Sequence, residues 1–191
     1  LKNFSDTLIK EISYSMNESV FKTLSKIILR TKEKKYSHKI NGRWENQFID
    51  MIHVPDVNKI LNAACCEGKK LMNQPLVIPH KELGFSRNEF WFNVAKPGNS
   101  TGWHDHKEKA TLSGVYYINI PKKSGDIFFR KKRNDVWVKW SVKSLAGKML
   151  LFDSRLEHSV EMNKSNNIRI SLAFNLYTLP VMIDNQVEEY S

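Results

Sequence analysis

The spacing of apolar residues changes near the middle of the chain. Over the first 75 residues, apolar side chains recur every three or four positions, which places each set on one face of a helix. This spacing predicts helices around residues 8–12, over residues 20–28 and over residues 55–73. Asn17 suits the N-cap of the second helix, and Pro55 suits the first turn of the third. We expect all three helices to support a sheet and to take no part in chemistry.

From residue 85 onward the chain has the pattern of short strands. Aromatic and β-branched residues gather in segments separated by Gly, Pro, Asn and Lys, which is typical of strands joined by turns. The predicted strands, besides a short extended piece around His104, span residues 89–95, 111–120, 126–130, 136–142, 148–152, 159–162 and 168–177. Their spacing is too short for the crossovers that parallel strands need. The predicted fold is therefore α+β and mainly β, a double-stranded β-helix (jelly roll) buttressed by N-terminal helices.

The overall composition is typical of one domain with a proper core, since 41% of the 191 residues are hydrophobic and 26% are charged. No apolar run approaches the roughly 20 residues of a membrane-spanning helix, and the amino terminus lacks the layout of a signal peptide. The two cysteines, Cys65 and Cys66, are adjacent, which disfavours a bridge between them. We therefore expect a cytoplasmic protein without membrane association.

The formal net charge of +10 favours anionic partners and makes nucleic acid a candidate ligand. The densest basic clusters are residues 32–35 and 130–133. The second cluster precedes Asn134 and Asp135 at an expected hairpin tip, where charged residues are common for solvation alone. The aromatic residues also lack the spacing of a stacking platform for single-stranded nucleic acid. We therefore do not favour nucleic acid as the partner, and we leave a homodimer open.

A histidine doublet, His104 and His106, carries the clearest chemical signal in the chain. Residues two apart in an extended strand point to the same face, so both imidazoles can bind one cation while Asp105 faces away. His158, from a distant strand, can complete a three-ligand site. Such a facial set leaves positions open for substrate, cosubstrate and oxygen. Two alternatives stay open, namely scattered surface histidines and Asp105 as the ligand in place of His106.

The doublet is followed by Ser-Gly-Val-Tyr-Tyr at residues 113–117 and, beyond the third histidine, by Arg169 and Ser171. With these motifs, residues 88–178 resemble a group of 2-oxoglutarate- and Fe(II)-dependent oxygenases. The resemblance implies that Fe(II) is the metal and that 2-oxoglutarate and O2 are cosubstrates. It implies that Arg169 binds the distal carboxylate of 2-oxoglutarate, because a planar guanidinium can form two hydrogen bonds to one carboxylate. It also implies that the hydroxyl of Ser171 contacts the same carboxylate.

Within this resemblance, His104, His106 and His158 take the positions of the iron ligands. The usual doublet ends in Asp or Glu, whereas here it ends in His106. Three neutral imidazoles leave a divalent metal at its full charge, so an anionic chelating cosubstrate should bind at least as readily. Asn93 and Tyr117 are further candidates for contact with the cosubstrate.

The activity that the resemblance implies is hydroxylation of a C–H bond in a small-molecule or peptide substrate, with release of succinate and CO2. Desaturation, cyclisation or demethylation would use the same residues. The implied organisation is one oxygenase domain over residues 1–191, with a helical support region (1–75), a jelly-roll core (85–178) and a tail (179–191). We expect residues 34–53 and 74–85 to select the substrate.

Two other functions stay open at the level of the sequence. One is a three-histidine dioxygenase of cupin type that does not use 2-oxoglutarate, although the Arg169 and Ser171 pair argues against it. The other is a non-catalytic jelly-roll module that binds nucleic acid or another polyanion through the net positive charge.

Overall fold

The fold consists of two antiparallel sheets with two helices on one side. The computed structural model describes residues 8–40, 43–106 and 110–181. In chain order, the elements are β1 (Ile9–Ser13), α1 (Glu18–Arg30), β2 (Lys35–Ile40), β3 (Arg43–Phe48), a 3-10 turn (Met51–His53), α2 (Val57–Met72), β4 (Leu76–Val77), a second 3-10 turn (Lys81–Leu83), β5 (Phe90–Ala95), β6 (Thr101–His104), β7 (Leu112–Asn119), β8 (Ile127–Arg133), β9 (Val136–Val142), β10 (Lys148–Asp153), β11 (Glu157–Val160) and β12 (Arg169–Thr178).

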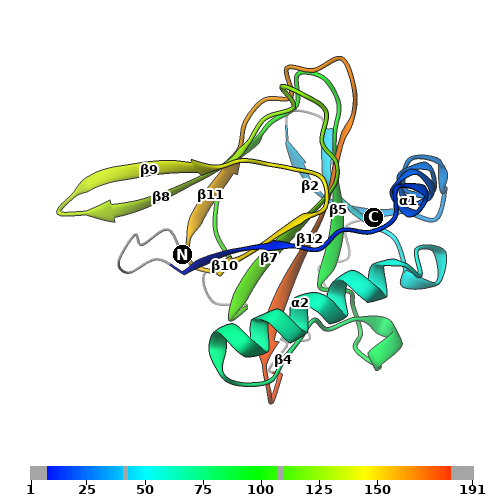
Figure 1. The fold of residues 1–191 in the computed structure, drawn as a ribbon, viewed down its shortest axis with the longest axis horizontal. Coiled ribbons are helices and arrows are strands. Elements are labelled where there is room, and N and C mark those ends of the chain that lie inside the picture. Colours follow the sequence, from blue (N-terminus) through cyan, green and yellow to red (C-terminus); the bar gives the residue numbers. More distant parts are fainter. Residues whose placement is uncertain (1–7, 41–42, 107–109, 182–191) are drawn as a thin grey trace.

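The strands form a large and a small sheet. The large sheet has the order β1-β10-β7-β12-β5-β3-β2, with β4 paired to β12 beside this path, and the small sheet has the order β6-β11-β8-β9. Neighbouring strands are antiparallel, and strands distant in the sequence lie side by side, as β12 does between β5 and β7. The two sheets face each other while the helices cover the outer face of the large one (Figure 1). The predicted mainly-β jelly roll with supporting helices is confirmed.

Alternation along the strands divides the core into two layers. Phe90 and Phe92 of β5 are fully buried in a cluster that also contains Ile60 of α2. The cluster between the sheets contains Leu150 of the large sheet and Phe129 of the small one. Successive strand residues point to opposite faces. Trp91 and Asn93 of β5, which alternate with the phenylalanines, are therefore directed toward the small sheet, where the candidate site lies.

Helix α1 begins where the sequence predicts, whereas α2 begins two residues later than predicted, so that Pro55 precedes the N-cap Asp56 instead of lying in the first turn. The side chain of Asn17 accepts a hydrogen bond from the backbone N–H of Ser19, at 3.2 Å, which confirms it as the N-cap of α1. Helix α2 begins at Val57, just after Pro55. The residues that α2 buries share one face of the helix: Val57, Ile60, Leu61, Ala64 and Gly68. These contacts hold α2 against the large sheet.

The helix predicted around residues 8–12 is wrong, because this segment forms β1 at the edge of the large sheet. Ile9 packs into the cluster between the sheets, whereas Leu8 and Ile12 pack against the cluster on the helix side. A strand whose two faces are both partly buried can carry apolar residues three apart as readily as a helix can. Pairing with β10, which lies far away in the sequence, decides for the strand.

Further strands differ from the prediction. Residues 35–40 and 43–48, within the segment 34–53 that was expected to select the substrate, form β2 and β3. These strands pair with each other, and β3 joins the large sheet through the pairing of Asn46 with Asn93. These strands are rich in polar residues, so they lack the alternation by which strands are found. Strand β11 begins at Glu157, ahead of its predicted start at residue 159.

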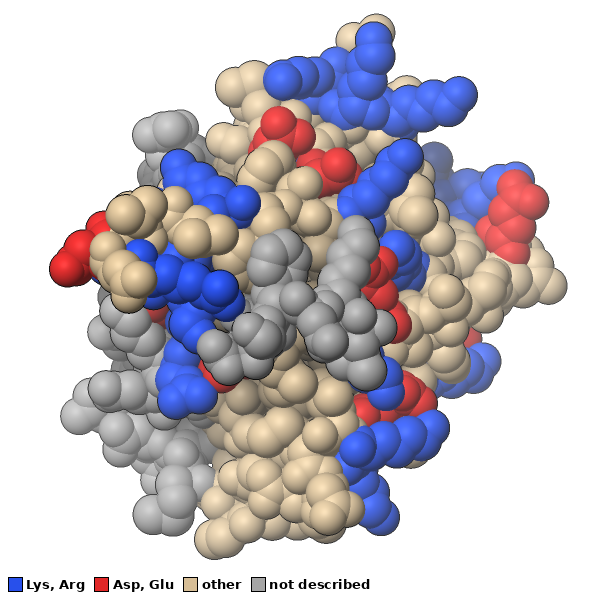
Figure 2. Space-filling model, turned by 60° about the vertical axis from the view of Figure 1, so that its left-hand side comes forward, with Lys and Arg blue, Asp and Glu red and all other residues tan. Residues whose placement is uncertain are grey.

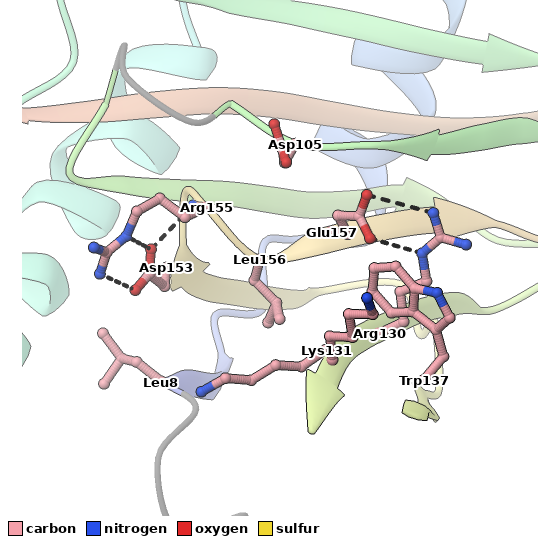
Figure 3. Close-up of a pocket in the computed structure, with 10 residues that line it drawn as sticks. Leu8, Asp105, Arg130, Lys131, Trp137, Asp153, Arg155, Leu156 and Glu157 are labelled. Atoms are coloured by element: carbon pink, nitrogen blue, oxygen red, sulfur yellow. Dashed lines mark hydrogen bonds and ion pairs between the residues drawn. The ribbon is translucent and has the colours of Figure 1, made fainter. Parts of the chain in front are cut away.

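The β8 and β9 hairpin projects away from the rest of the molecule (Figure 1). Turning this side forward brings many Lys and Arg side chains into view, with fewer Asp and Glu among them (Figure 2). A cavity of about 460 Å³ lies at the foot of the hairpin (Figure 3). Its lining combines charged and apolar side chains: Leu8, Asp105, Arg130, Lys131, Lys132, Trp137, Asp153, Arg155, Leu156 and Glu157.

The support region predicted over residues 1–75 contains strands β1 to β3 in addition to α1 and α2. Residues 182–191 of the predicted tail lie outside the described residues, and the division of the chain into regions stays a prediction. None of the described helices has the length and apolar character needed to cross a membrane.

Candidate metal centre

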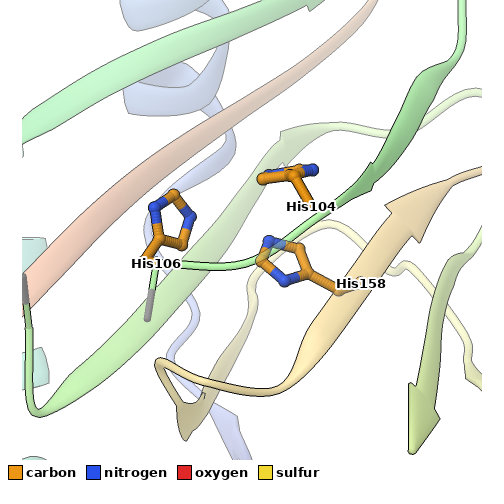
Figure 4. A group of neighbouring side chains, drawn as sticks. All are labelled: His104, His106 and His158. Carbon is orange, nitrogen blue, oxygen red and sulfur yellow. The ribbon is translucent and has the colours of Figure 1, made fainter. Parts of the chain in front are cut away.

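Three histidines from different parts of the chain converge at one end of the small sheet (Figure 4). His104 is the last residue of β6 and pairs across the sheet with His158, the second residue of β11. His106 lies just beyond β6, where its backbone N–H donates to the carbonyl of Ser154 at 2.9 Å. The ring centroids of His104 and His158 are 4.2 Å apart. Strand pairing therefore brings together ligands that are more than fifty positions apart in the sequence.

The three imidazoles present suitable donor atoms to a metal. One nitrogen from each ring lies within 4.8 Å of the others. Nδ1 of His104 lies 2.9 Å from the carbonyl of Gly102, and Nδ1 of His158 lies 3.0 Å from the carbonyl of Leu156. A carbonyl can only accept, so in each neutral ring Nδ1 carries the proton and Nε2 keeps its lone pair for a metal.

Burial keeps one of the three imidazoles in the neutral form that binds a metal. His158 is 6% exposed, and its burial, with the nearby His104 ring, lowers the pKa of its imidazole well below the usual value. His158 is therefore neutral at pH 7 and available as a ligand. Phe152 packs edge-on against this ring at 4.9 Å, and Trp91 lies 6.0 Å from the ring of His106. His104 is exposed, so the site opens to solvent on one side.

Asp105, the alternative second ligand, does not join the three histidines. Among the described residues, the cluster with donor atoms close enough to share a metal consists of His104, His106 and His158. Asp105 lines the neighbouring cavity instead (Figure 3). Three neutral imidazoles suit iron, and they also suit zinc, copper and nickel. The donor set therefore fits Fe(II), and which ligands bind it stays a prediction.

The residues predicted to contact the cosubstrate lie together on the inner face of the large sheet. Ser171 of β12 pairs with Asn93 of β5 on one side and with Tyr117 of β7 on the other. Directly paired residues point to the same face of a sheet. Arg169 lies two residues before Ser171 and therefore on this face as well. The four side chains form one polar row, which we call the inner polar row.

Arg169 and its neighbours fit an anionic ligand. Arg169 is 4% exposed, and its guanidinium donates to the carbonyls of Ser124 and, at 3.1 Å, Glu161. Oδ1 of Asn93 and Oη of Tyr117 are buried without a hydrogen-bond partner in the described part of the chain. Burial raises the pKa of the Tyr117 hydroxyl well above its usual value, so this group stays a neutral donor. A buried cation beside unsatisfied polar atoms is the setting that a dicarboxylate such as 2-oxoglutarate requires.

Both the sequence and the fold of this chain are similar to those of known proteins. Residues 89–175 match the family model described as "Putative 2OG-Fe(II) oxygenase". This part of the chain belongs to the 2OG-Fe(II) oxygenase family. The matched segment contains the three histidines and the whole inner polar row, and the protein is accordingly an oxidoreductase that uses Fe(II) and 2-oxoglutarate. Among curated proteins, none matches the chain by sequence.

Solved structures share the fold of this 2OG-Fe(II) oxygenase at low sequence identity. The non-haem alpha-ketoglutarate-dependent carbocyclase SnoK from nogalamycin biosynthesis has a TM-score of 0.67 at 13% identity, over 88% of this chain and 78% of that one. A Pseudomonas putida prolyl-4-hydroxylase has a TM-score of 0.60 at 15% identity, over 89% and 94%. The epimerase SnoN, in complex with Fe3+, alpha-ketoglutarate and nogalamycin RO, has a TM-score of 0.62 at 11% identity, over 96% and 87%.

Sequence reasoning missed several residues around the site of this oxygenase. Arg130 of β8 forms an ion pair with Glu157, at 2.7 Å, and its guanidinium lies 4.5 Å from the ring of Trp103. Glu157 and Trp103 each adjoin a predicted iron ligand, so Arg130 connects the two ligand strands on their outer face. The basic run at residues 130–133 was the available signal, but only the register of β8 with β11 places Arg130 there.

Proposed function

We propose that this 2OG-Fe(II) oxygenase hydroxylates a C–H bond of a small molecule or peptide, with His104, His106 and His158 as iron ligands. In that reaction the substrate C–H, 2-oxoglutarate and O2 give the alcohol, succinate and CO2, so that one oxygen atom enters each organic product. The observation that carries the proposal is the convergence of the three histidines beside the inner polar row.

Each group in the site has a defined task in this proposal. Fe(II), when bound, supplies the oxidising chemistry that protein side chains lack. The three imidazoles hold the metal while leaving positions open to the cosubstrate and oxygen. Arg169 binds the distal carboxylate of 2-oxoglutarate, Ser171 and Tyr117 donate hydroxyl hydrogen bonds, and Asn93 lines the same face. Phe152 and Trp91 help to exclude water from the metal.

The breadth of the substrate proposal follows from the neighbours. Their names describe a carbocyclase and an epimerase from nogalamycin biosynthesis and a prolyl-4-hydroxylase. These names support small-molecule and peptide substrates alike. We also propose a cytoplasmic location, which is supported by Cys65 and Cys66 both being free. The homodimer stays an open prediction.

Succinate release tests the proposal directly. Protein loaded anaerobically with Fe(II) and 2-oxoglutarate should release succinate when O2 is admitted, and slow turnover is expected even without the primary substrate. Omission of iron, omission of oxygen and the His158→Ala variant are the controls. If the loaded protein neither binds nor consumes 2-oxoglutarate but does consume O2 with a thiol or diketone, the three-histidine dioxygenase of cupin type is the correct function instead.

A further inference from the structure

The β8 and β9 hairpin extends past the small sheet at the end that carries the metal ligands. β11 pairs with β8 from Glu157, opposite Arg130, to Val160, opposite Ile127. Residues 131–133 of β8 therefore run beyond the start of β11 and pair with β9. At about 3.4 Å per residue, this overhang is about 10 Å long. Because His158 is the second residue of β11, the overhang stands next to the metal centre.

This hairpin concentrates positive charge. Residues 127–142 contain five cationic side chains and one carboxylate, Asp135, which gives a net charge of +4 out of +10 for the whole chain. Lys132 and Arg133 are exposed on the overhang. Val136 and Trp137, on the facing strand, are 65% and 44% exposed. An exposed surface that is both cationic and apolar suits an anionic partner that also offers apolar groups.

The outer strand of the hairpin presents an open edge. In the described part of the chain, β9 pairs with β8 on one side and ends the small sheet on the other. Its register runs without interruption from Val136, opposite Arg133, to Val142, opposite Ile127. A regular edge strand exposes a row of backbone N–H and C=O groups, which an extended polypeptide can pair with and a nucleic acid cannot.

The tryptophans of this surface disfavour nucleic acid for a second reason. The guanidinium of Arg130 lies 4.5 Å from the ring centroid of Trp103 and 4.3 Å from that of Trp137. The ammonium of Lys139 also lies 5.7 Å from the Trp103 ring. Single-stranded nucleic acid binds by stacking bases on aromatic faces. Here, cationic side chains lie over the rings of Trp103 and Trp137 and compete with such stacking.

A cavity lies between this surface and the strands that carry the predicted iron ligands. It measures about 460 Å³, and its lining includes Lys131 and Trp137 of the hairpin together with Asp105, Leu156 and Glu157 (Figure 3). Asp105 and Glu157 adjoin predicted iron ligands in the sequence, and Leu156 lies two residues before His158. An extended chain that lies along the hairpin can therefore direct a side chain into a cavity beside the strands that carry these ligands.

We infer that the substrate of this oxygenase is a polypeptide, and that an acidic segment of it docks along the β8 and β9 hairpin as an added strand beside β9. This inference rests on the proposed function, because it names the substrate class of the same metal site. The hairpin would supply affinity and orientation through charge and backbone pairing, beside the strands that carry the predicted iron ligands.

Binding of a labelled Glu-rich peptide, measured by fluorescence anisotropy, tests the inference. The controls are a Gln-rich peptide of equal length and an oligothymidylate of equal charge. The Glu-rich peptide should bind most tightly, and its affinity should fall as salt is raised. If the oligothymidylate binds as tightly as the Glu-rich peptide, or if neither peptide binds, the inference is wrong.

Paired charge reversals locate the binding surface. The double variant Lys132→Glu/Arg133→Glu should weaken Glu-rich peptide binding by about tenfold or more. Its matched control, Lys26→Glu/Lys69→Glu, makes the same change of charge at exposed positions of α1 and α2 and should leave the affinity unchanged. Equal losses in both variants would mean that overall charge alone attracts the peptide, which overturns docking at the hairpin.

Hydrogen exchange tests the added strand. The amides of β9, residues 136–142, should exchange more slowly when the Glu-rich peptide is bound, and unchanged exchange there would rule out pairing at this edge. Titration of 2-oxoglutarate into the anaerobic Fe(II) protein separates the two proposals. Peptide binding without 2-oxoglutarate binding contradicts the proposed function alone, whereas 2-oxoglutarate binding without peptide binding contradicts this inference alone.

Discussion

At the scale of single residues, the segment 113–117 shows how one strand divides its side chains between two tasks. Tyr116 points to the helix side, where its hydroxyl donates to the carbonyl of Tyr14 at 2.8 Å. Tyr117 points to the inner side, where its hydroxyl has no partner among the described residues. Ser113, also on the inner side, donates to Oδ1 of Asn175 at 3.0 Å. Of two adjacent tyrosines, one thus packs on the helix side and the other lies in the inner polar row.

The first prediction at this scale concerns iron retention. His158→Ala should lose Fe(II), because it removes one of three protein ligands, while His53→Ala, which changes an exposed histidine outside the cluster, should keep it. Iron is measured after anaerobic loading and desalting. Near-stoichiometric iron in purified His158→Ala would remove this residue from the ligand set.

A second prediction distinguishes His106 from Asp105 as the second metal ligand. Asp105→Ala should retain iron, because this side chain lines the cavity, and His106→Ala should lose it. His106→Asp should still bind iron, because it restores the carboxylate of the usual doublet. The same loading assay applies to all three variants. Loss of iron in Asp105→Ala together with retention in His106→Ala would reverse the assignment.

The third prediction concerns the cosubstrate. Arg169→Leu should leave iron in place and raise the Kd for 2-oxoglutarate, since charge-assisted hydrogen bonds to a carboxylate are lost. Such bonds contribute about 1.5–3 kcal/mol, which corresponds to a rise of about 10- to 150-fold in Kd. The absorption band of the anaerobic iron complex reports the titration.

Two companion variants make the Arg169 result interpretable. Arg169→Lys keeps a positive charge near the carbonyls of Ser124 and Glu161 and should fall between the leucine variant and the unmutated protein. Arg155→Leu removes an exposed arginine that pairs with Asp153 and should leave the Kd unchanged. A rise in Kd for Arg155→Leu but not for Arg169→Leu would transfer the carboxylate contact to Arg155.

At the scale of elements, close packing of neighbouring strands explains the glycine in the Ser-Gly-Val-Tyr-Tyr motif. Gly114 of β7 pairs with Phe174 of β12. A Cβ added at Gly114 would lie 2.1 Å from Cε2 of the phenylalanine ring, so the ring rests directly on the glycine backbone. The motif therefore contains a packing requirement of the large sheet as well as residues of the site.

The fourth prediction follows from this contact. Gly114→Ala should destabilise the fold by about 1–3 kcal/mol, which is typical of overpacking in a core. Gly102→Ala is the matched control, because an added Cβ there has no neighbour within 4 Å, and its effect should stay within about 0.5 kcal/mol. Urea unfolding gives both values. Equal stability of the two variants would mean that the Phe174 ring moves aside without cost.

At the scale of the whole molecule, metal binding should stabilise the tertiary fold. His104 and His158 lie on paired strands, while His106 follows β6, so one ion bound by all three would join these segments. A ligand that binds the folded state alone, at a concentration of one hundred times its Kd, adds about 2.7 kcal/mol. The architecture therefore couples metal occupancy to stability.

The fifth prediction is a metal-dependent rise in Tm. Anaerobic Fe(II) at this excess should raise Tm by about 5–10 °C for a protein of this size. The His158→Ala variant should show no rise, and Mg²⁺, which prefers oxygen ligands, should have no effect on the unmutated protein. Differential scanning calorimetry measures the shifts. An equal rise with Mg²⁺ would point to general ionic effects rather than to the histidine cluster.

Local spacing was sufficient to predict part of the fold and the main chemical groups. The alternation over residues 136–142 predicts β9 with its observed bounds, and Asn17 predicts the start of α1. The doublet at His104 and His106 indicates a metal because residues two apart on an extended chain share a face. These inferences succeed because each depends on geometry within a few residues of the chain.

Tertiary structure decided what depends on contacts between distant segments. Residues 8–12 become a strand because β10 pairs with them, and the polar hairpin of β2 and β3 is recognisable only through its contact with β5. Arg130 lies beside β11, which carries His158, because the register of β8 with β11 places it there. Sequence alone determined which groups could bind iron and 2-oxoglutarate, whereas pairing across the sheets determined which of them meet, because long-range register is not encoded in local spacing.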